Sequence, residues 1–173
     1  IMGVSVTVSV PPVQGSLEWG GMLRFDAAGF VFRMIFMSAA ALTALFAGQY
    51  ETLKIRGEFY ALLLISTLGM NLMASAADLI LLFLAIETTS IPLYVMAGFM
   101  TRDDRSVEAG IKYFLFGAIT SAVMLYGFSL IYGLTGTTQI YELRSAFQAG
   151  YLPIGLAGLV IVLVLVGFGF KIS

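Results

Sequence analysis

The sequence predicts an all-α fold, a polytopic bundle of helices that crosses a membrane several times, and three observations carry that prediction. Of its 173 residues, 60% are hydrophobic and only 11% are charged, whereas soluble domains have about 25% charged residues. The charges gather between long apolar windows instead of being spread along the chain. Five windows approach the roughly 20 residues that a helix needs to cross a bilayer. So little charge could not coat a water-facing surface.

The expected spans follow one another through most of the chain. They cover about residues 27–48, 59–76, 79–99, 111–132 and 152–172, each bounded by charged or turn-forming residues. Only residues 75–78 separate the second span from the third, so these two should form an antiparallel hairpin. Asp78 suits the N-cap of the third span. Residues 135–150, which contain Gly136, are expected to form an external loop.

The first 26 residues are expected to lie outside the bundle. Residues 1–10 fit the end of an earlier helix or a loop strand, and residues 11–19, with paired prolines, fit an external loop. The chain starts at Ile1 and stops at Ser173 inside an apolar run. We therefore interpret it as a fragment of a longer protein, with the transmembrane bundle in residues 27–173.

The basic residues near span ends predict the orientation in the membrane. Arg24 and Arg144 should lie on one side, and four others should lie on the opposite side: Lys54, Arg56, Arg102 and Arg105. Because short cytoplasmic loops carry an excess of Lys and Arg, the loop 101–106 is predicted to be cytoplasmic. The expected location is a multi-pass position in the cell's inner (plasma) membrane, with the lipid bilayer as a partner.

Composition also excludes several functions. The net charge of -1 gives no field to attract nucleic acid. The chain has no Cys and no His, which are the usual ligands of zinc, haem and iron–sulfur clusters. We therefore expect no metal site, no bound cofactor and no redox centre in this chain. Any proton chemistry must be carried by lysines and carboxylates.

Glu87 is the most informative charged residue, because it lies near the middle of the third predicted span. An ionised group at that depth costs about 2.5–3.5 kcal/mol on insertion scales, and such groups are functional by default. Pro92 lacks the N–H that would bond the Thr88 carbonyl, so a free acceptor is expected beside the carboxylate. The alternative is a packing carboxyl that is protonated or bonded to a neighbour.

Two lysines are further candidates, each with a simpler alternative. Lys112 could reach inward, or it could pair with Glu108 one turn earlier or extend to the membrane surface. Lys171 lies late in the fifth span, where it could flank the cytoplasmic end. The neighbouring Gly167 and Gly169 instead favour a closely packed, buried amine.

Several segments resemble a known family. They read GEFYALLL (57–64), DLILLFLAIE (78–87), SIPLYVMAGF (90–99), EAGIKYFL (108–115), GLTGTT (133–138) and GFGFKIS (167–173). Together these segments closely resemble the antiporter-like proton-translocating family of membrane subunits, and within it subunit N of bacterial complex I, the NADH:quinone oxidoreductase. The resemblance covers about residues 57–173, and the combination is far more specific than any one segment.

The resemblance implies an antiporter-like fold and a role for each candidate. Glu87 would be a helix-borne carboxylate paired with Lys112 of the next helix, and Lys171 would be the central channel lysine. When the pair weakens, Lys112 would repel the Lys171 ammonium and promote proton release. The energy would come from quinone reduction in other subunits, so the chain would be part of a translocating enzyme.

The same resemblance implies a set of partners. The parent complex would contain FMN, iron–sulfur clusters and quinone, together with other antiporter-like subunits and small membrane-arm subunits. Two related assemblies stay open as alternatives, a multisubunit cation/proton antiporter and a membrane-bound hydrogenase. A purely structural helical bundle is the third.

Overall fold

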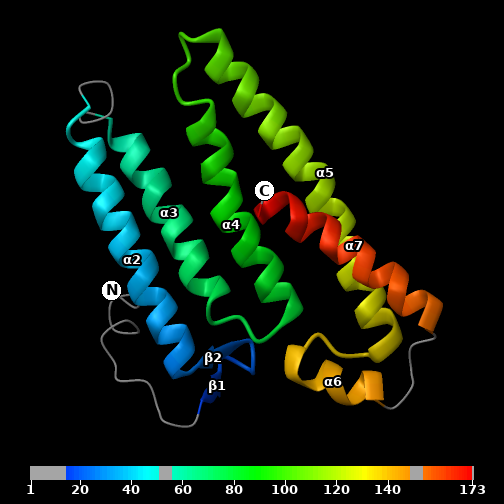
Figure 1. Ribbon diagram of the computed structural model, residues 1–173. Helices are drawn as coiled ribbons and strands as arrows, with labels where there is room; N and C mark the ends of the chain where they lie inside the picture. Colours follow the sequence, from blue (N-terminus) through cyan, green and yellow to red (C-terminus); the bar gives the residue numbers. More distant parts are fainter. Residues whose placement is uncertain (1–14, 51–55, 149–153, 173) are drawn as a thin grey trace.

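The computed structural model describes residues 15–50, 56–148 and 154–172, and its architecture is helical (Figure 1). Six helices are described: α2 (Ala27–Ala47), α3 (Gly57–Met73), α4 (Leu79–Ala97), α5 (Asp104–Thr135), α6 (Ile140–Gln148) and α7 (Ile154–Ile172). Two short strands, β1 (Ser16–Glu18) and β2 (Leu23–Phe25), precede them. The prediction of an all-α bundle is confirmed, while the interpretation of residues 1–10 lies outside the described residues.

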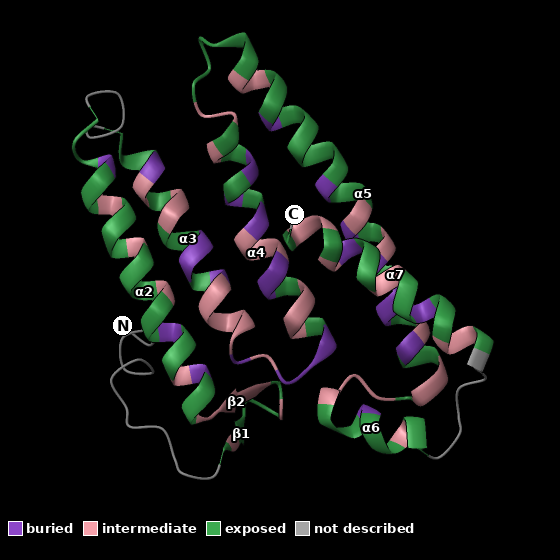
Figure 2. Ribbon diagram, viewed as in Figure 1, coloured by how far each residue is buried: buried purple, intermediate pink, exposed green. Residues whose placement is uncertain are grey.

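The helices α2 to α5 lie side by side in chain order, and α7 packs along α5 with its C-terminal end beside the middle of α4 (Figure 1). The main buried cluster forms where α4, α5 and α7 meet. It includes Ile86, Met124, Phe128 and Val160. Buried residues line the facing sides of these helices, while their outer faces are exposed (Figure 2). Exposed apolar faces are expected where the solvent is lipid.

The predicted spans correspond to helices in the structure. Within the described residues, α2, α4, α5 and α7 are long and apolar enough to cross a membrane. Helix α3 is shorter, with 17 residues, or about 26 Å at 1.5 Å per residue. The loop 74–78 joins α3 and α4 as the expected antiparallel hairpin.

Helix α5 begins earlier than the sequence predicted. The expected span started at residue 111, but the helix starts at Asp104 and has 32 residues, or about 48 Å. Asp103 caps it by accepting a hydrogen bond from the Arg105 backbone N–H at 3.0 Å. The helix therefore contains the predicted span and extends beyond it at the N-terminal end, because polar turns of a helix can continue past the roughly 30 Å hydrocarbon layer.

The predicted external loop at residues 135–150 contains a helix, α6. Its residues Ile140, Leu143 and Phe147 follow helical spacing, and Leu143 is buried. Residues 16–25 form the antiparallel β1–β2 hairpin, within a segment that was also partly predicted to be a loop. Both elements are too short to give a strong sequence signal.

Asp78 is the residue directly before α4, at the end of the bundle where this helix begins. One of its carboxylate oxygens accepts bonds from the backbone N–H groups of Ile80 at 2.8 Å and Leu81 at 3.3 Å, which confirms the predicted N-cap. The other oxygen accepts a bond from the Thr138 hydroxyl. Asp78 is 2% exposed, so these hydrogen bonds replace the water that its carboxylate would otherwise bind.

Backbone hydrogen bonds join three segments around Asp78, and we call this set the backbone clamp. The Leu79 N–H donates to the Thr138 carbonyl at 2.9 Å, and the Ile140 N–H donates to the Ala77 carbonyl at 2.9 Å. On the other side, the Ala77 N–H donates to the Met22 carbonyl at 2.8 Å. The clamp fixes the start of α4 against the end of α5 and against the hairpin.

Replacing Asp78 by alanine should destabilise the fold by about 2–4 kcal/mol, because both a helix cap and a buried charged hydrogen bond are lost. The matched control is Asp103→Ala, which removes an exposed N-cap and should cost about 1 kcal/mol. Unfolding of the full-length chain in mixed detergent micelles measures both. Equal effects of the two substitutions would contradict the assigned role of Asp78.

Candidate functional site

The amine of Lys171 is held by three side chains of α4. Its Nζ donates to the Tyr94 hydroxyl at 2.7 Å, to the Ser90 hydroxyl at 2.8 Å and to Glu87 Oε1 at 3.3 Å. An ammonium group has three N–H donors, so this set uses all of them. The side chains of Lys171 and Glu87 are 13% and 21% exposed, so the ion pair is largely shielded from solvent.

The spacing of the three α4 residues explains how one helix supplies all the partners. Positions 87, 90 and 94 correspond to i, i+3 and i+7, which lie on one face of an α-helix. Lys171 reaches this face because α7 lies close to α5. At Gly167, an added Cβ would lie 2.5 Å from the Cβ of Met124, so only glycine permits that approach. The close packing predicted from Gly167 and Gly169 is present at Gly167, whereas an added Cβ at Gly169 would meet nothing within 4 Å.

Helix α5 contributes Ser121 to the same centre. Its hydroxyl donates to Glu87 Oε1 at 2.6 Å, and the residue is 4% exposed. The same carboxylate oxygen therefore accepts one bond from the Lys171 ammonium and one from a neutral hydroxyl. Such bonds compensate for part of the hydration that the carboxylate loses inside the bundle.

Lys112 is not part of this centre. It forms an ion pair with Glu108 of the same helix, and its side chain is 65% exposed. The ion pair expected between Glu87 and Lys112 is thus replaced by two others, Glu87 with Lys171 and Lys112 with Glu108. The structure therefore agrees with the simpler interpretation of Lys112, an ion pair with Glu108 one turn earlier on the same helix.

Depth in the bundle is the physical reason for this difference. Glu87 lies level with Ser121, which is nine residues along α5 from Lys112. At 1.5 Å per residue, nine residues correspond to about 13 Å. A lysine side chain is too short to span that distance together with the gap between the helices.

Three residues that contribute to the site were not assigned a role in proton transfer by the sequence analysis. These residues are Ser90, Ser121 and Tyr94, which are uncharged and therefore do not stand out in an apolar window. The spacing of Glu87, Ser90 and Tyr94 on one helix face was the signal that could have found two of them. For Ser121 no comparable signal exists, because its level relative to Glu87 depends on the register between two helices.

The chemistry available to this centre is proton exchange between an amine and a carboxylate. In the described part of the chain, no group of three or more His, Cys, Asp or Glu residues is placed to hold a metal ion. Moving one proton from the ammonium to Glu87, or to a hydroxyl network, would change the local charges without any redox step. The surrounding helices α4, α5 and α7 keep the low dielectric in which such a change has a large electrostatic effect.

The fold and the site together define a class of protein, a membrane-type helical bundle with a largely shielded lysine–glutamate pair between two of its helices. Residues 76–173 match the family described as NADH:quinone oxidoreductase/Mrp antiporter, transmembrane. The chain belongs to this family.

Curated relatives of the chain are named as subunits of NADH-quinone oxidoreductase. The chain is 37% identical to NADH-quinone oxidoreductase subunit N 2 of Symbiobacterium thermophilum over 191 residues, which covers 100% of this chain and 38% of the relative. It is 43% identical to NADH-quinone oxidoreductase subunit N of Desulfitobacterium hafniense over 155 residues, covering 88% of this chain and 31% of the relative. The chain therefore spans about a third of the length of these relatives.

Two solved structures share the fold. The respiratory complex I from Thermus thermophilus with bound aureothin contains a chain that is 36% identical, with a TM-score of 0.70, over 91% of this chain and 33% of that chain. The archaeal membrane-bound sulfane sulfur reductase contains one that is 23% identical, with a TM-score of 0.75, over 95% of this chain and 34% of that chain. The second likeness concerns the fold alone.

Proposed function

We propose that this chain is part of the proton-translocating membrane subunit N of an NADH:quinone oxidoreductase, and that Glu87 and Lys171 transfer the proton. The observation that carries the proposal is the shielded ion pair between α4 and α7, with Nζ and Oε1 3.3 Å apart. A lysine and a carboxylate buried at membrane depth are costly unless they have a function. The match to the family and to curated relatives named subunit N supports the same assignment.

In the proposed mechanism, Glu87 controls the proton on Lys171 electrostatically. While the carboxylate is charged, it stabilises the ammonium at short range in a low dielectric. When Glu87 is neutralised or moves away, that stabilisation is lost and the amine releases its proton to a hydrated path. Return of the charged carboxylate favours protonation again, which resets the centre.

The parent complex supplies the energy in this proposal. Quinone reduction would take place in other subunits, which would hold FMN and the iron–sulfur clusters. The direct partners of this chain would be other antiporter-like subunits and small membrane-arm subunits. The complex would lie in the inner (plasma) membrane, with the loop 101–106 on the cytoplasmic side.

Lys112 receives a different place in the proposed path. It lies in the N-terminal part of α5, close to the 98–103 connection, and it is paired with Glu108 and largely exposed. We assign it to proton exchange at that end, away from the central pair. Because Lys112 does not contact Glu87 directly, its influence on the centre should be weaker than that of Lys171.

The test is proton pumping driven by quinone reduction in vesicles that contain the intact parent complex. Lys171→Ala and Glu87→Ala should lower pumping at least tenfold, because one member of the exchanging pair is lost. Lys112→Ala is the matched control, since it removes the same kind of side chain outside the central pair, and it should lower pumping less. Normal pumping by assembled Lys171→Ala complexes would refute the proposal.

A second candidate is a subunit of a multisubunit cation/proton antiporter or a membrane-bound hydrogenase. This alternative is supported by the description of the matching family, which includes Mrp antiporters. An antiporter would use the same buried pair without an electron-transfer arm. Purification of the native complex distinguishes the two, because copurifying flavin and iron–sulfur subunits would favour the oxidoreductase.

A further inference from the structure

We propose that Tyr94 positions the amine of Lys171 for proton exchange, and that Gly117 sets the place of Tyr94. This inference rests on the proposed role of Lys171. The Tyr94 hydroxyl is the nearest partner of the amine, at 2.7 Å, whereas the carboxylate oxygen of Glu87 lies 3.3 Å away. Charge-assisted bonds of this kind are typically about 2.7–2.9 Å long. The Tyr94 hydroxyl, together with the Ser90 hydroxyl at 2.8 Å, therefore holds the ammonium more closely than the carboxylate does.

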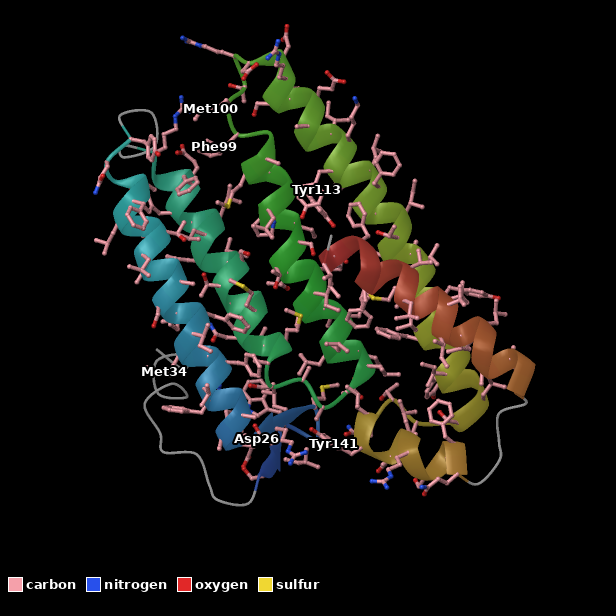
Figure 3. All side chains as sticks on the ribbon, viewed as in Figure 1. Asp26, Met34, Phe99, Met100, Tyr113 and Tyr141 are labelled. Carbon is pink, nitrogen blue, oxygen red and sulfur yellow. The ribbon has the colours of Figure 1, made fainter. Side chains whose placement is uncertain are left out.

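The ring of Tyr94 is fixed on several sides. The residue is 4% exposed, and its ring meets the ring of Tyr113 edge to face, with centroids 4.6 Å apart. A second edge contact joins it to Phe114, with centroids 6.0 Å apart. Figure 3 shows Tyr113 on α5, on the side that faces α4. Such edge-to-face pairs are favourable for aromatic rings and leave Tyr94 little freedom to rotate.

Gly117 provides the space that the Tyr94 hydroxyl occupies. A Cβ added at Gly117 would lie 2.2 Å from the hydroxyl oxygen and 2.5 Å from the ring carbon that bears it. Any other residue at position 117 would push the hydroxyl away from its present place. The Tyr94 hydroxyl in turn bonds to the Nζ of Lys171. The glycine at position 117 of α5 therefore affects where the amine of Lys171 on α7 lies.

Tyr94 contacts the amine through its hydroxyl. The Lys171 Nζ lies 2.7 Å from the Tyr94 hydroxyl oxygen and 5.3 Å from the centre of the ring, so the amine lies beyond the hydroxyl end of the ring and not over its face. The titratable side chains around the amine include Glu87 and Tyr94 from α4, and Tyr113 from α5, whose ring contacts Phe170. Tyr113 thus approaches the same region without bonding to the amine.

The experiment compares Tyr94→Phe, Gly117→Ala and Tyr113→Phe in the full-length chain within the intact parent complex. Quinone-driven proton pumping in vesicles is recorded across a range of pH. Tyr94→Phe removes only the hydroxyl that holds Lys171, and it should lower pumping at least twofold and shift its pH profile. Gly117→Ala displaces the same hydroxyl and should give the same pattern. Tyr113→Phe removes a hydroxyl that does not bond to Lys171, and its profile should match the wild type.

Two results would overturn the inference. The first is a wild-type pumping rate and pH profile in an assembled Tyr94→Phe complex, or in an assembled Gly117→Ala complex if Tyr94→Phe does not assemble. The second is an equal shift in Tyr113→Phe, which would mean that any change in the aromatic cluster has this effect. Lys171→Ala separates this inference from the proposed function. If Lys171→Ala pumps normally the function itself is refuted, whereas impaired Lys171→Ala with normal Tyr94→Phe refutes only the role of Tyr94.

Discussion

Replacing Glu87 alone by alanine should destabilise the folded protein by about 3–5 kcal/mol, because it leaves the shielded Lys171 ammonium without its counter-charge. The amine would keep its bonds to Ser90 and Tyr94, but hydroxyls carry no opposite charge. Unfolding of the full-length chain in mixed detergent micelles measures this loss. The exposed ion pair offers a control: Glu108→Ala removes the partner of Lys112 and should cost at most about 1 kcal/mol.

A double substitution separates stability from function at the same site. Glu87→Gln together with Lys171→Met removes both charges, so much of the stability lost in Glu87→Ala should return, since replacing a whole buried pair is often neutral. Pumping should not return, because neither member of the proton-exchanging pair remains. If the double variant is no more stable than Glu87→Ala, the two charges are not energetically coupled as the structure indicates.

Replacing Gly69 by alanine should destabilise the protein by about 3 kcal/mol, because the site is already fully packed. A Cβ at Gly69 would lie 2.5 Å from both the backbone nitrogen and the hydroxyl of Thr89, and 2.9 Å from the Ala85 carbonyl oxygen. Backbone atoms cannot rotate away, so α3 would have to move from α4. The bond from the Ser66 hydroxyl to the Thr89 carbonyl, at 3.1 Å, would be stretched as well.

Gly133 provides the matched control for this prediction. It lies in α5, and nothing lies within 4 Å of an added Cβ. Gly133→Ala should therefore leave stability unchanged or raise it by up to about 1 kcal/mol, because alanine favours the helix. Thermal unfolding of both variants tests the pair. If Gly69→Ala were as stable as Gly133→Ala, the close contact between α3 and α4 would not exist in the protein.

The overall fold could be predicted well from the sequence because one physical requirement dominates it. A helix that crosses a bilayer must be long and apolar, and α2, α4 and α7 satisfy this so clearly that their positions follow from composition. Boundaries were less certain where polar turns extend a helix past the apolar layer, as at the start of α5. Helix α6 was missed because a nine-residue amphipathic helix is not distinguished by length from a loop.

The candidate site was only partly predictable, for a different reason. Glu87 and Lys171 can be identified in the sequence, because placing a charged group inside an apolar window is energetically unfavourable wherever the window lies. That free energy does not tell which two charged residues form an ion pair. Which lysine reaches Glu87 depends on the register of α5 and on the closeness of α7, and both are set by glycines and by packing between helices distant in sequence. Lys112 was therefore assigned to the wrong partner.

The backbone clamp around Asp78 constrains the chain in a way that side chains do not. Its bonds between Leu79, Ala77 and their partners use N–H and carbonyl groups, which every residue except proline can supply. What the clamp specifies is therefore mainly the number of residues in the connections 74–78 and 136–139. One inserted residue there would shift α4 along α5 and separate Glu87 from Ser121, although every side chain of the centre would still be present.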